Sequence, residues 1–400
     1  MNAKNTLCSH FTNMQQNLKQ KLAELRSKNL FREFRTITSS CSNIVKFKGK
    51  EYIMLASNNY FGLNTRPKVI SAAIKALKKY GSGNVASRLI VNLDLHEKLE
   101  KEIAKYKKCE SALVYANGYA TNIGIISSIV GKEDLIISDE LNHASIIDGC
   151  RLSKADINVY KHCDVKYLEN KLKKSKNKKI LVVTDSVFSM DGDIAPLRKI
   201  IELKKKYQFM LMIDDAHATG ILDTNLNGID IHMGTLSKAL ASQGGFVAGS
   251  SELIDYLRNT SRSFMFSTGL SPANTASALA ALKIIKEDKQ LKINLLKNAD
   301  YLREGFRKLG FQVGGELQVI PLIIGNNKKT MQFQKLLEED GIFVTGIRPP
   351  TVPIARLRIS VMATHTKQQL DKALESFEKI GKKLGILKEF NSLGWKNSGY

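Results

Sequence analysis

The sequence lacks the features that would make this chain a membrane protein or a disulfide-stabilised one. Among its 400 residues, no apolar run approaches the roughly 20 residues of a membrane span, so we expect no membrane partner. The five cysteines are odd in number and form no C-x-x-C pair. This pattern argues against a disulfide framework or a zinc site, so we expect no metal and a reducing compartment. The first residues lack the apolar core of a secretory signal. Their acid-poor composition leaves organelle import open, with the cytoplasm as the default expectation.

Acidic residues are also few relative to basic ones. The chain has 61 Lys and Arg against 38 Asp and Glu, which gives a formal net charge of +23. Such a charge suits a polyanionic partner, either a nucleic acid or an acidic carrier protein, but it also fits a lysine-rich surface with no such role. The lysine run at 171–179 has no interleaved aromatic residues for base stacking. We therefore expect no nucleic-acid partner.

What the sequence does contain is an alternation of apolar, strand-like runs with helical segments. Strands are predicted at 52–56, 111–115, 135–138, 180–184, 209–213 and 229–233, and helices at 16–34, 69–80, 95–107, from 118 and from 143. This rhythm predicts an α/β fold with a mostly parallel sheet and flanking helices. Later in the chain, helices at 278–287 and 291–309 precede short strands at 318–324, 343–345 and 356–361. We expect an N-terminal helical segment (1–48), a large α/β domain (49–280) and a small C-terminal α+β domain (281–400).

Two short strings carry the most specific chemical signal. D-D-A-H at 214–217 and T-L-S-K at 235–238 each follow a predicted strand. If both strands are parallel, Asp214 and Lys238 project from the sheet edge where open α/β folds bind ligands. A lysine amine and a carboxylate at that edge suit pyridoxal 5'-phosphate (PLP), which needs an amine for covalent attachment and an anion beside its ring nitrogen.

Three further strand ends carry polar motifs: N-G-Y at 117–119, N-H-A-S at 142–145 and S-V-F-S-M-D-G-D at 186–193. Each motif alone has a structural explanation, since Ser189 and Thr235 fit helix caps and a single His143 fits a structural role. Their joint order along one predicted sheet edge is much more specific than any one of them.

Together with S-N-N-Y-F-G-L at 57–63 and L-D-L-H-E-K-L-E at 93–100, these motifs resemble the α-oxoamine synthase family of fold-type I PLP enzymes. The resemblance extends from about residue 32 to 361. It implies a fold-type I PLP-dependent transferase with PLP as cofactor. The implied reaction joins an amino acid to an acyl thioester with loss of carbon dioxide.

The resemblance also implies roles for single residues. Lys238 would anchor the cofactor and move the proton, Asp214 would pair with the ring nitrogen, and His217 would donate to the phenolic oxygen. His143 would stack on the ring. The other cofactor-side candidates are Gly118 and Tyr119 at the phosphate, the hydroxyls of Ser189 and Thr235, and Ser267 and Thr268, which would reach the neighbouring subunit's phosphate in a homodimer.

The substrate prediction rests on R-P-P-T-V-P at 348–353 and R-L-R at 356–358. These strings resemble the branch that condenses L-alanine with a pimeloyl thioester, carried by acyl carrier protein or CoA, to give 8-amino-7-oxononanoate for biotin synthesis. Arg358 would grip the amino-acid carboxylate with its planar fork. The other substrate-side candidates are Arg32, Asn58 and Thr351.

Alternatives stay open at this stage. Within the family, the chain could be a glycine C-acetyltransferase (2-amino-3-ketobutyrate ligase) or use a different acyl thioester. A basic nucleic-acid-binding protein without enzyme activity is the rival from another class. Departures from the family pattern at 84–92, 221–229 and 353–356 leave the acyl donor undecided.

Overall fold

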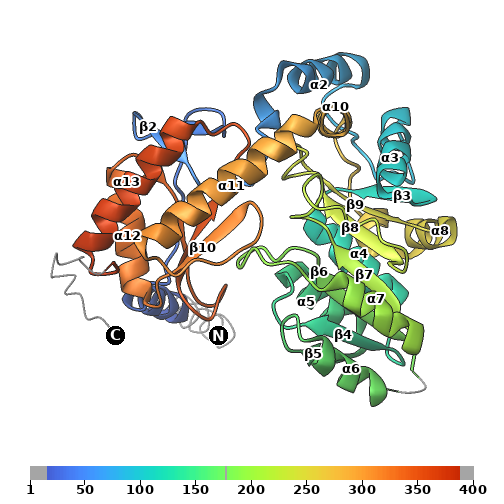
Figure 1. Ribbon diagram of the computed structural model, residues 1–400. Helices are drawn as coiled ribbons and strands as arrows, with labels where there is room; N and C mark the ends of the chain where they lie inside the picture. The colour runs from blue at the N-terminus through green and yellow to red at the C-terminus, as the bar shows by residue number, and fades with distance from the viewer. Residues whose placement is uncertain (1–15, 176–177, 388–400) are drawn as a thin grey trace, which may run out of the picture.

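The computed structural model describes residues 16–175 and 178–387, and Figure 1 shows them arranged in two lobes. The larger lobe is built on a seven-stranded sheet with the order β3-β9-β8-β7-β6-β4-β5. Its strands are β3 (Ser111–Tyr115), β4 (Leu135–Asp139), β5 (Asp156–Tyr160), β6 (Ile180–Asp185), β7 (Met210–Asp214), β8 (Ile231–Thr235) and β9 (Gly245–Gly249). Only β9 runs antiparallel to its neighbours, β3 and β8. The predicted mostly parallel sheet is therefore confirmed.

Strand β9 was not predicted, because its run, Gly-Phe-Val-Ala-Gly, begins and ends with glycine. Glycine weakens a strand signal and often marks a close approach of another backbone. Here a Cβ on Gly245 would lie 2.8 Å from the Cα of Gly118. Because β9 reverses direction between β3 and β8, the carboxyl ends of β3, β4, β6, β7 and β8 all meet at one sheet edge. Strand β5 was also not predicted.

Helices cover both faces of this sheet, as the alternating residues of β6 show. Leu181 and Val183 pack with α4 (Gly118–Ile129), α5 (Ala144–Ser153) and α8 (Ser251–Thr260). Ile180 and Val182 pack on the other face with α6 (Val165–Lys173) and α7 (Leu197–Lys206). This period of two is what a sheet buried on both faces requires. The remaining elements of this lobe are η1 (Leu63–Thr65), α2 (Pro67–Tyr80), α3 (Asp94–Lys107), α9 (Arg262–Met265) and α10 (Pro272–Glu287).

The smaller lobe combines the end of the chain with part of its beginning. One sheet has the order β10 (Val319–Ile323), β13 (Arg356–Ser360), β12 (Thr345–Ile347), and the other has β1 (Ile44–Phe47), β2 (Lys50–Met54), β11 (Ile342–Phe343). Helices α11 (Lys289–Leu309), α12 (Asn327–Glu339) and α13 (Lys367–Lys383) pack on them through a core that includes Phe306, Phe333 and Phe377. The expected boundaries at 49 and 281 stay a prediction. Strand β2 nevertheless pairs with β11 of the smaller lobe, not with the large sheet.

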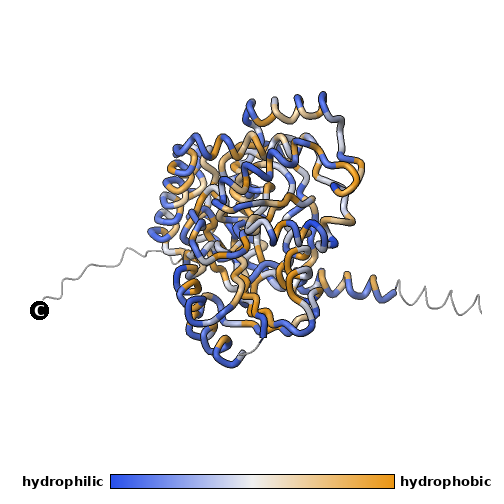
Figure 2. Tube along the Cα trace, turned by 90° about the vertical axis from the view of Figure 1, so that its right-hand side faces the viewer, coloured by the Kyte–Doolittle hydropathy of each residue, from blue (hydrophilic) through white to orange (hydrophobic). Residues whose placement is uncertain are grey.

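The N-terminal helix is shorter than predicted. It was expected to reach residue 34, but it ends at residue 27, and Asn29 follows in the left-handed region with φ of 55°. Along the outer helices, hydrophilic and hydrophobic residues alternate every few positions (Figure 2). No helix in the described part of the chain is long and apolar enough to cross a membrane. The expectations for residues 1–15, 176–177 and 388–400 lie outside the described residues.

Candidate active site

A hydrogen-bonded chain of five side chains runs through the common sheet edge. The Nζ atom of Lys238 lies 2.8 Å from Nε2 of His217, and Nδ1 of His217 lies 2.6 Å from the hydroxyl of Tyr60. The Tyr60 hydroxyl donates to Oδ1 of Asn58 at 3.1 Å, and the same oxygen accepts from Nη2 of Arg358 at 3.1 Å. These donors and acceptors are consistent with a neutral His217 whose proton is on Nδ1. The chain joins the predicted Lys238 and Arg358 through groups from both lobes.

Burial has the largest effect on the protonation of Lys238 and His217, the first two groups of this hydrogen-bonded series. Burial is the largest cause that lowers the pKa of the Lys238 amine, and Arg358 adds to it, while Asp214 and Asp185 act in the opposite direction; the net pKa is about 8. Burial also holds the pKa of His217 well below its usual range, and the positive charge of Lys238 adds to this effect. A neutral His217 can therefore accept a hydrogen bond from the Lys238 amine. A lysine with this pKa has a sizeable fraction of free amine near neutral pH, as covalent chemistry requires.

Asp214 is a buried carboxylate with no ion-pair partner among the described side chains. It ends β7 and is only 2% exposed. Oδ2 accepts from Nδ2 of Asn122 at 2.7 Å, and Oδ1 accepts from the backbone N–H of Ala216 at 2.8 Å. These neutral donors orient the carboxylate without neutralising it. A buried anion of this kind calls for a cation, and a protonated ring nitrogen would supply one.

The neighbouring Asp215 has the opposite environment. Its Oδ2 lies 2.7 Å from Nζ of Lys107, and both side chains are at most 2% exposed. The hydroxyls of Ser186 and Thr224 also donate to this carboxylate, at 2.7 and 2.8 Å. Burial would raise the pKa of Asp215, but Lys107 and His232 outweigh it and hold that pKa below its usual range. Of the two consecutive aspartates, only Asp214 is left available to a ligand.

His143 and Asp185 complete the edge on the other side of Asp214. The backbone N–H of His143 donates to Oδ2 of Asp185 at 2.8 Å, and its Nδ1 lies 2.7 Å from the Ser145 hydroxyl. Burial lowers the pKa of His143. Burial and then the nearby Asp214 raise the pKa of Asp185 well above its usual value, which favours its protonated form. The His143 ring is therefore neutral, and the hydrogen bond to Asp185 fixes the backbone that carries it.

The start of α4 forms a tight turn over β8. Asn117 caps the helix by accepting from the backbone N–H of Ala120 at 2.8 Å, and Gly118 is the first helical residue. A Cβ on Gly118 would meet Oγ1 of Thr235 at 3.3 Å, so a side chain there would press on the predicted hydroxyl group. The first N–H groups of a helix have no acceptor within the helix and favour an anion. Tyr119, the next residue, is 43% exposed.

PLP fits this set of residues. The edge offers a half-buried amine of lowered pKa, a buried carboxylate with no ion-pair partner among the described side chains, and a glycine-initiated helix N-terminus beside Thr235. These three groups match the aldehyde, the ring nitrogen and the phosphate of the cofactor. The roles assigned to the individual site residues, Lys238 and Asp214 included, stay predictions.

The substrate-side candidates fall into two groups. In the first, Arg358 uses three of its N–H donors: Nε donates to the Ser189 carbonyl at 2.6 Å, Nη1 to the Ser360 hydroxyl at 2.7 Å, and Nη2 to Asn58. Since a guanidinium carries five N–H donors, two remain for a ligand carboxylate. In the second group, Nη2 of the exposed Arg32 donates to Oγ1 of Thr351 at 3.0 Å.

The Arg32–Thr351 pair lines a cavity of about 840 Å³. Basic side chains dominate its charged lining: Arg26, Arg32, Arg35, Lys48, Lys335 and Arg348, against Glu33 and Glu338. Arg348 is held by the carbonyls of Asn29 and Phe31. Burial and the nearby Arg32 lower the pKa of Arg348. The cavity therefore favours an anionic ligand beside the Arg32–Thr351 pair.

Ser267 and Thr268 lie in an exposed segment. Thr268 forms an isolated antiparallel bridge with Ser87, in the loop before α3. Large apolar side chains nearby are exposed to solvent, with Val85 at 88%, Ile90 at 79% and Phe266 at 71%. These side chains form a surface on which a second chain can pack.

Tyr60, Asn122 and Asp185 belong to the site but were not predicted. Tyr60 lies within the S-N-N-Y string that was recognised, so a weak signal for it was present. Asn122 and Asp185 contact Asp214 or His143 across 92 and 42 residues of sequence. No local pattern reveals such contacts before the fold is known.

Comparison with known proteins places this geometry among PLP-dependent enzymes. The family model of the class I and II aminotransferases matches residues 50–377. An 8-amino-7-oxononanoate synthase from Thermoanaerobacter pseudethanolicus is 46% identical over 386 residues, covering 92% of this chain and 98% of the relative. A serine palmitoyltransferase from S. paucimobilis, solved with bound PLP and myriocin, is 29% identical with a TM-score of 0.88, covering 93% of this chain and 98% of that one. An 8-amino-7-oxononanoate synthase from Francisella tularensis is 28% identical with a TM-score of 0.71, covering 83% of this chain and 98% of that one.

Proposed function

Because the chain belongs to the family of class I and II aminotransferases, within its α-oxoamine synthases, we propose that it condenses L-alanine with a pimeloyl thioester. The products are 8-amino-7-oxononanoate, carbon dioxide and the free thiol carrier, in the synthesis of biotin. The observation that carries the proposal is the juxtaposition of Lys238, His217 and the unpaired carboxylate of Asp214 at one sheet edge. The 46% identity to an 8-amino-7-oxononanoate synthase supports the choice of substrates.

The chain's own residues supply binding, orientation and proton transfer. PLP supplies an aldehyde that binds an amine and a protonated ring that withdraws electrons from the substrate's α-carbon. Lys238 would hold the cofactor, with Asp214 against the ring nitrogen and Gly118 with Thr235 near the phosphate. The amine of Lys238 would remove the α-proton of the bound L-alanine and later return one. A pKa of about 8 lets Lys238 do both near neutral pH.

The substrate carboxylate is assigned to Arg358. Ser189, Ser360 and Asn58 accept from three of its five N–H donors and fix the plane of the guanidinium, so two donors remain. A planar fork with two free donors suits a carboxylate that is held until it leaves as carbon dioxide. In the overall reaction, the α-carbon bonds to the acyl carbon, the C–S bond breaks to release the thiol, and the bond to the carboxylate breaks.

The acyl thioester is assigned to the basic cavity beside Arg32 and Thr351. Both acyl carrier protein and CoA present their thiol on a phosphate-bearing arm, so the positive lining fits either carrier. Arg32→Ala should raise the KM for the thioester more than the KM for L-alanine. Equal effects on both substrates would remove Arg32 from the thioester site.

We further propose that the active enzyme is a cytoplasmic homodimer. The exposed Val85, Ile90 and Phe266, next to the Ser87–Thr268 bridge, support a subunit interface that brings Ser267 and Thr268 to the partner's site. Among the described residues, the cysteines at 41, 109, 150 and 163 are free thiols. An active species that elutes at the single-chain mass of 44.6 kDa would contradict the dimer.

The function is tested by mass spectrometry of the product. The purified protein with PLP should form 8-amino-7-oxononanoate from L-alanine and pimeloyl-CoA, and Lys238→Ala should form none. Glycine with acetyl-CoA serves as the competing pair. A preference for that pair would replace the proposed substrates with those of a glycine C-acetyltransferase.

A further inference from the structure

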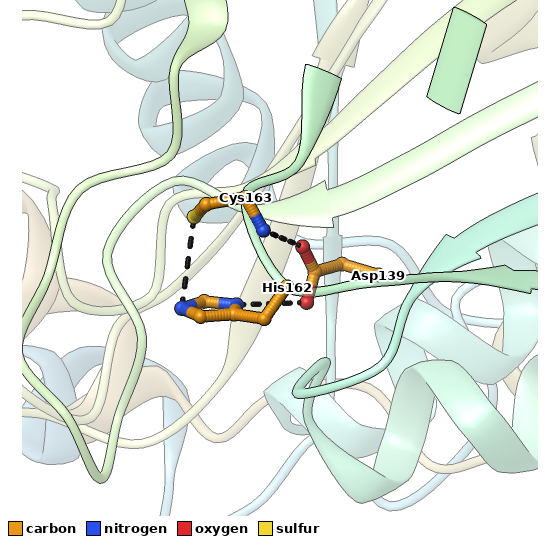
Figure 3. Close-up of side chains that lie close together, drawn as sticks. All are labelled: Asp139, His162 and Cys163. Atoms are coloured by element: carbon orange, nitrogen blue, oxygen red, sulfur yellow. Dashed lines mark hydrogen bonds and ion pairs between the residues drawn. The ribbon is translucent and has the colours of Figure 1, made fainter. Parts of the chain in front are cut away.

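His162, outside the group of residues described above, is held between two carboxylates from different turns. Its Nδ1 lies 3.0 Å from Oδ1 of Asp139, and its Nε2 lies 2.5 Å from Oδ2 of Asp193. Figure 3 shows His162 with Asp139 and the neighbouring Cys163. Burial would lower the pKa of His162, but these two carboxylates outweigh burial and raise that pKa to about 12. The ring is therefore an imidazolium that donates from both nitrogens.

Each carboxylate belongs to a turn that carries site residues. Asp139 ends β4 and also accepts from the backbone N–H groups of Leu141 and Cys163, both at 2.9 Å, so it shapes the turn that leads to His143. Asp193 closes the turn after β6, where its carbonyl accepts from the N–H of Phe188 at 3.1 Å. His162 thus ties the turn after β4 to the turn after β6.

The second turn reaches the substrate arginine. The buried ring of Phe188 lies edge-on to His162, with 4.3 Å between the ring centroids. The next residue, Ser189, offers its carbonyl to Nε of Arg358 at 2.6 Å. A shift of this turn would therefore turn the guanidinium that faces the substrate.

We propose that His162 is a positioning residue, whose imidazolium clamps Asp139 to Asp193 so that the Ser189 carbonyl orients Arg358 for the carboxylate of the amino-acid substrate. The inference rests on the proposed function, because that function assigns the carboxylate to Arg358. His162 acts through Phe188 and Asp193 and touches neither substrate nor cofactor.

The same cluster offers ligand atoms for a metal ion, since atoms of Asp139, His162 and Cys163 lie within 4.8 Å of one another. The thiol Sγ of Cys163 is 3.6 Å from Nε2 of His162. Both ring nitrogens, however, already face carboxylates, and a metal would have to displace a tightly held proton. The clamp accounts for all of these contacts without an ion, and a metal is kept as an outcome of the test.

The test compares amino-acid binding with cofactor binding. His162→Phe keeps the ring against Phe188 but removes both charged hydrogen bonds, and Asp193→Asn removes one charge with little change in shape. In the PLP-loaded enzyme, both variants should raise the dissociation constant for L-alanine, followed by the change in visible absorbance, by about tenfold to a hundredfold. The dissociation constant for PLP should change by less than about twofold, since Lys238 and Asp214 lie outside the clamp and both variants keep the contacts by which Asp139 holds the turn before His143.

Cys163→Ser is the matched control, because it keeps the backbone N–H that Asp139 accepts. This variant should bind L-alanine like the wild type. Wild-type affinity for L-alanine in both clamp variants, or an equal loss of PLP and L-alanine affinity, would overturn the proposal. If His162→Phe fails to fold, Asp193→Asn decides the matter alone.

Two further outcomes separate the competing explanations. If dialysis against EDTA weakens L-alanine binding in the wild type, the cluster is a metal site and the clamp is wrong. If the wild type binds glycine or serine in place of L-alanine, the proposed substrate fails, and the clamp is tested with that amino acid by the same comparison. If the clamp variants then lose affinity for that amino acid but not for PLP, the result still supports the clamp.

Discussion

The amine of Lys238 lies 2.8 Å from Nε2 of His217 at the carboxyl edge of the large sheet, where His217 is buried and Lys238 is half-buried. Two basic groups at this distance cannot both be positively charged at low cost in a site shielded from water. The structure resolves the conflict by keeping His217 neutral and by lowering the pKa of Lys238 from 10.5 to about 8. Burial, the largest cause of this lowered pKa, therefore leaves part of Lys238 as the free amine that covalent chemistry requires before any ligand arrives.

The first prediction concerns the pH dependence of cofactor loading. Only a neutral amine can add to an aldehyde, so the rate at which the apo-protein binds PLP through the proposed Lys238 should rise with pH through a midpoint near 8. Stopped-flow absorbance over a pH series measures this rate. A midpoint near 10.5, the ordinary value for lysine, would show that the buried environment does not act on Lys238 as described.

The second prediction separates two neighbouring carboxyl groups. Asp214→Asn removes the charge proposed to face the ring nitrogen and should lower kcat by about a hundredfold or more. Asp185→Asn is the matched control, because burial favours the protonated form of Asp185, which an amide resembles in shape and charge. Its effect on kcat should stay below about tenfold. Similar losses in the two variants would remove the special role given to Asp214.

The third prediction concerns the buried Lys107–Asp215 ion pair. Lys107→Met leaves the Asp215 charge buried without its partner and should lower the free energy of unfolding by about 3–5 kcal/mol. Lys107→Met combined with Asp215→Leu removes both charges and should recover much of that loss. Lys105→Met, on the exposed side of the same helix, should change the unfolding free energy by less than about 0.5 kcal/mol. Urea denaturation measures all three. A double variant no more stable than Lys107→Met would contradict this account.

The fourth prediction follows from the raised pKa of His162. Its pKa is about 12 in the folded protein and near 6.5 when unfolded, so the folded state holds one more proton between these values. The stability from this proton is fully present below pH 6.5 and is lost as the pH rises toward 12. The melting temperature of the wild type should therefore fall more steeply between about pH 7 and pH 10 than that of His162→Phe. Parallel slopes would show that Asp139 and Asp193 do not hold this proton.

Much of the architecture was predictable because its signals are local. The predicted strand 180–184 differs from β6 by one residue at its end, and 209–213 differs from β7 by one residue at each end; α2 begins at Pro67, as the fixed φ of proline favours. Strand β9 was not predictable in this way, since its glycines carry no strand signal and its place depends on contacts with β3 and β8. The pairing of β2 with β11 likewise joins distant segments that no local pattern relates.

The same limit applies to the site. Asp214, His217 and Lys238 were found because they follow predicted strands in recognisable strings. Tyr60 and Asn122 entered only through contacts across 157 and 92 residues of sequence. The clamp on His162 was invisible for another reason, because its effect depends on which two turns Asp139 and Asp193 belong to.

The most direct test of the central claim follows the carboxylate of the amino acid. L-alanine labelled with carbon-13 in its carboxyl group is supplied with pimeloyl-CoA, and labelled carbon dioxide is measured together with the product. We predict one labelled carbon dioxide for each 8-amino-7-oxononanoate formed, with none released when the thioester or Lys238 is absent. Label that stays in the product, or release that does not depend on the thioester, would contradict a decarboxylative condensation at this site.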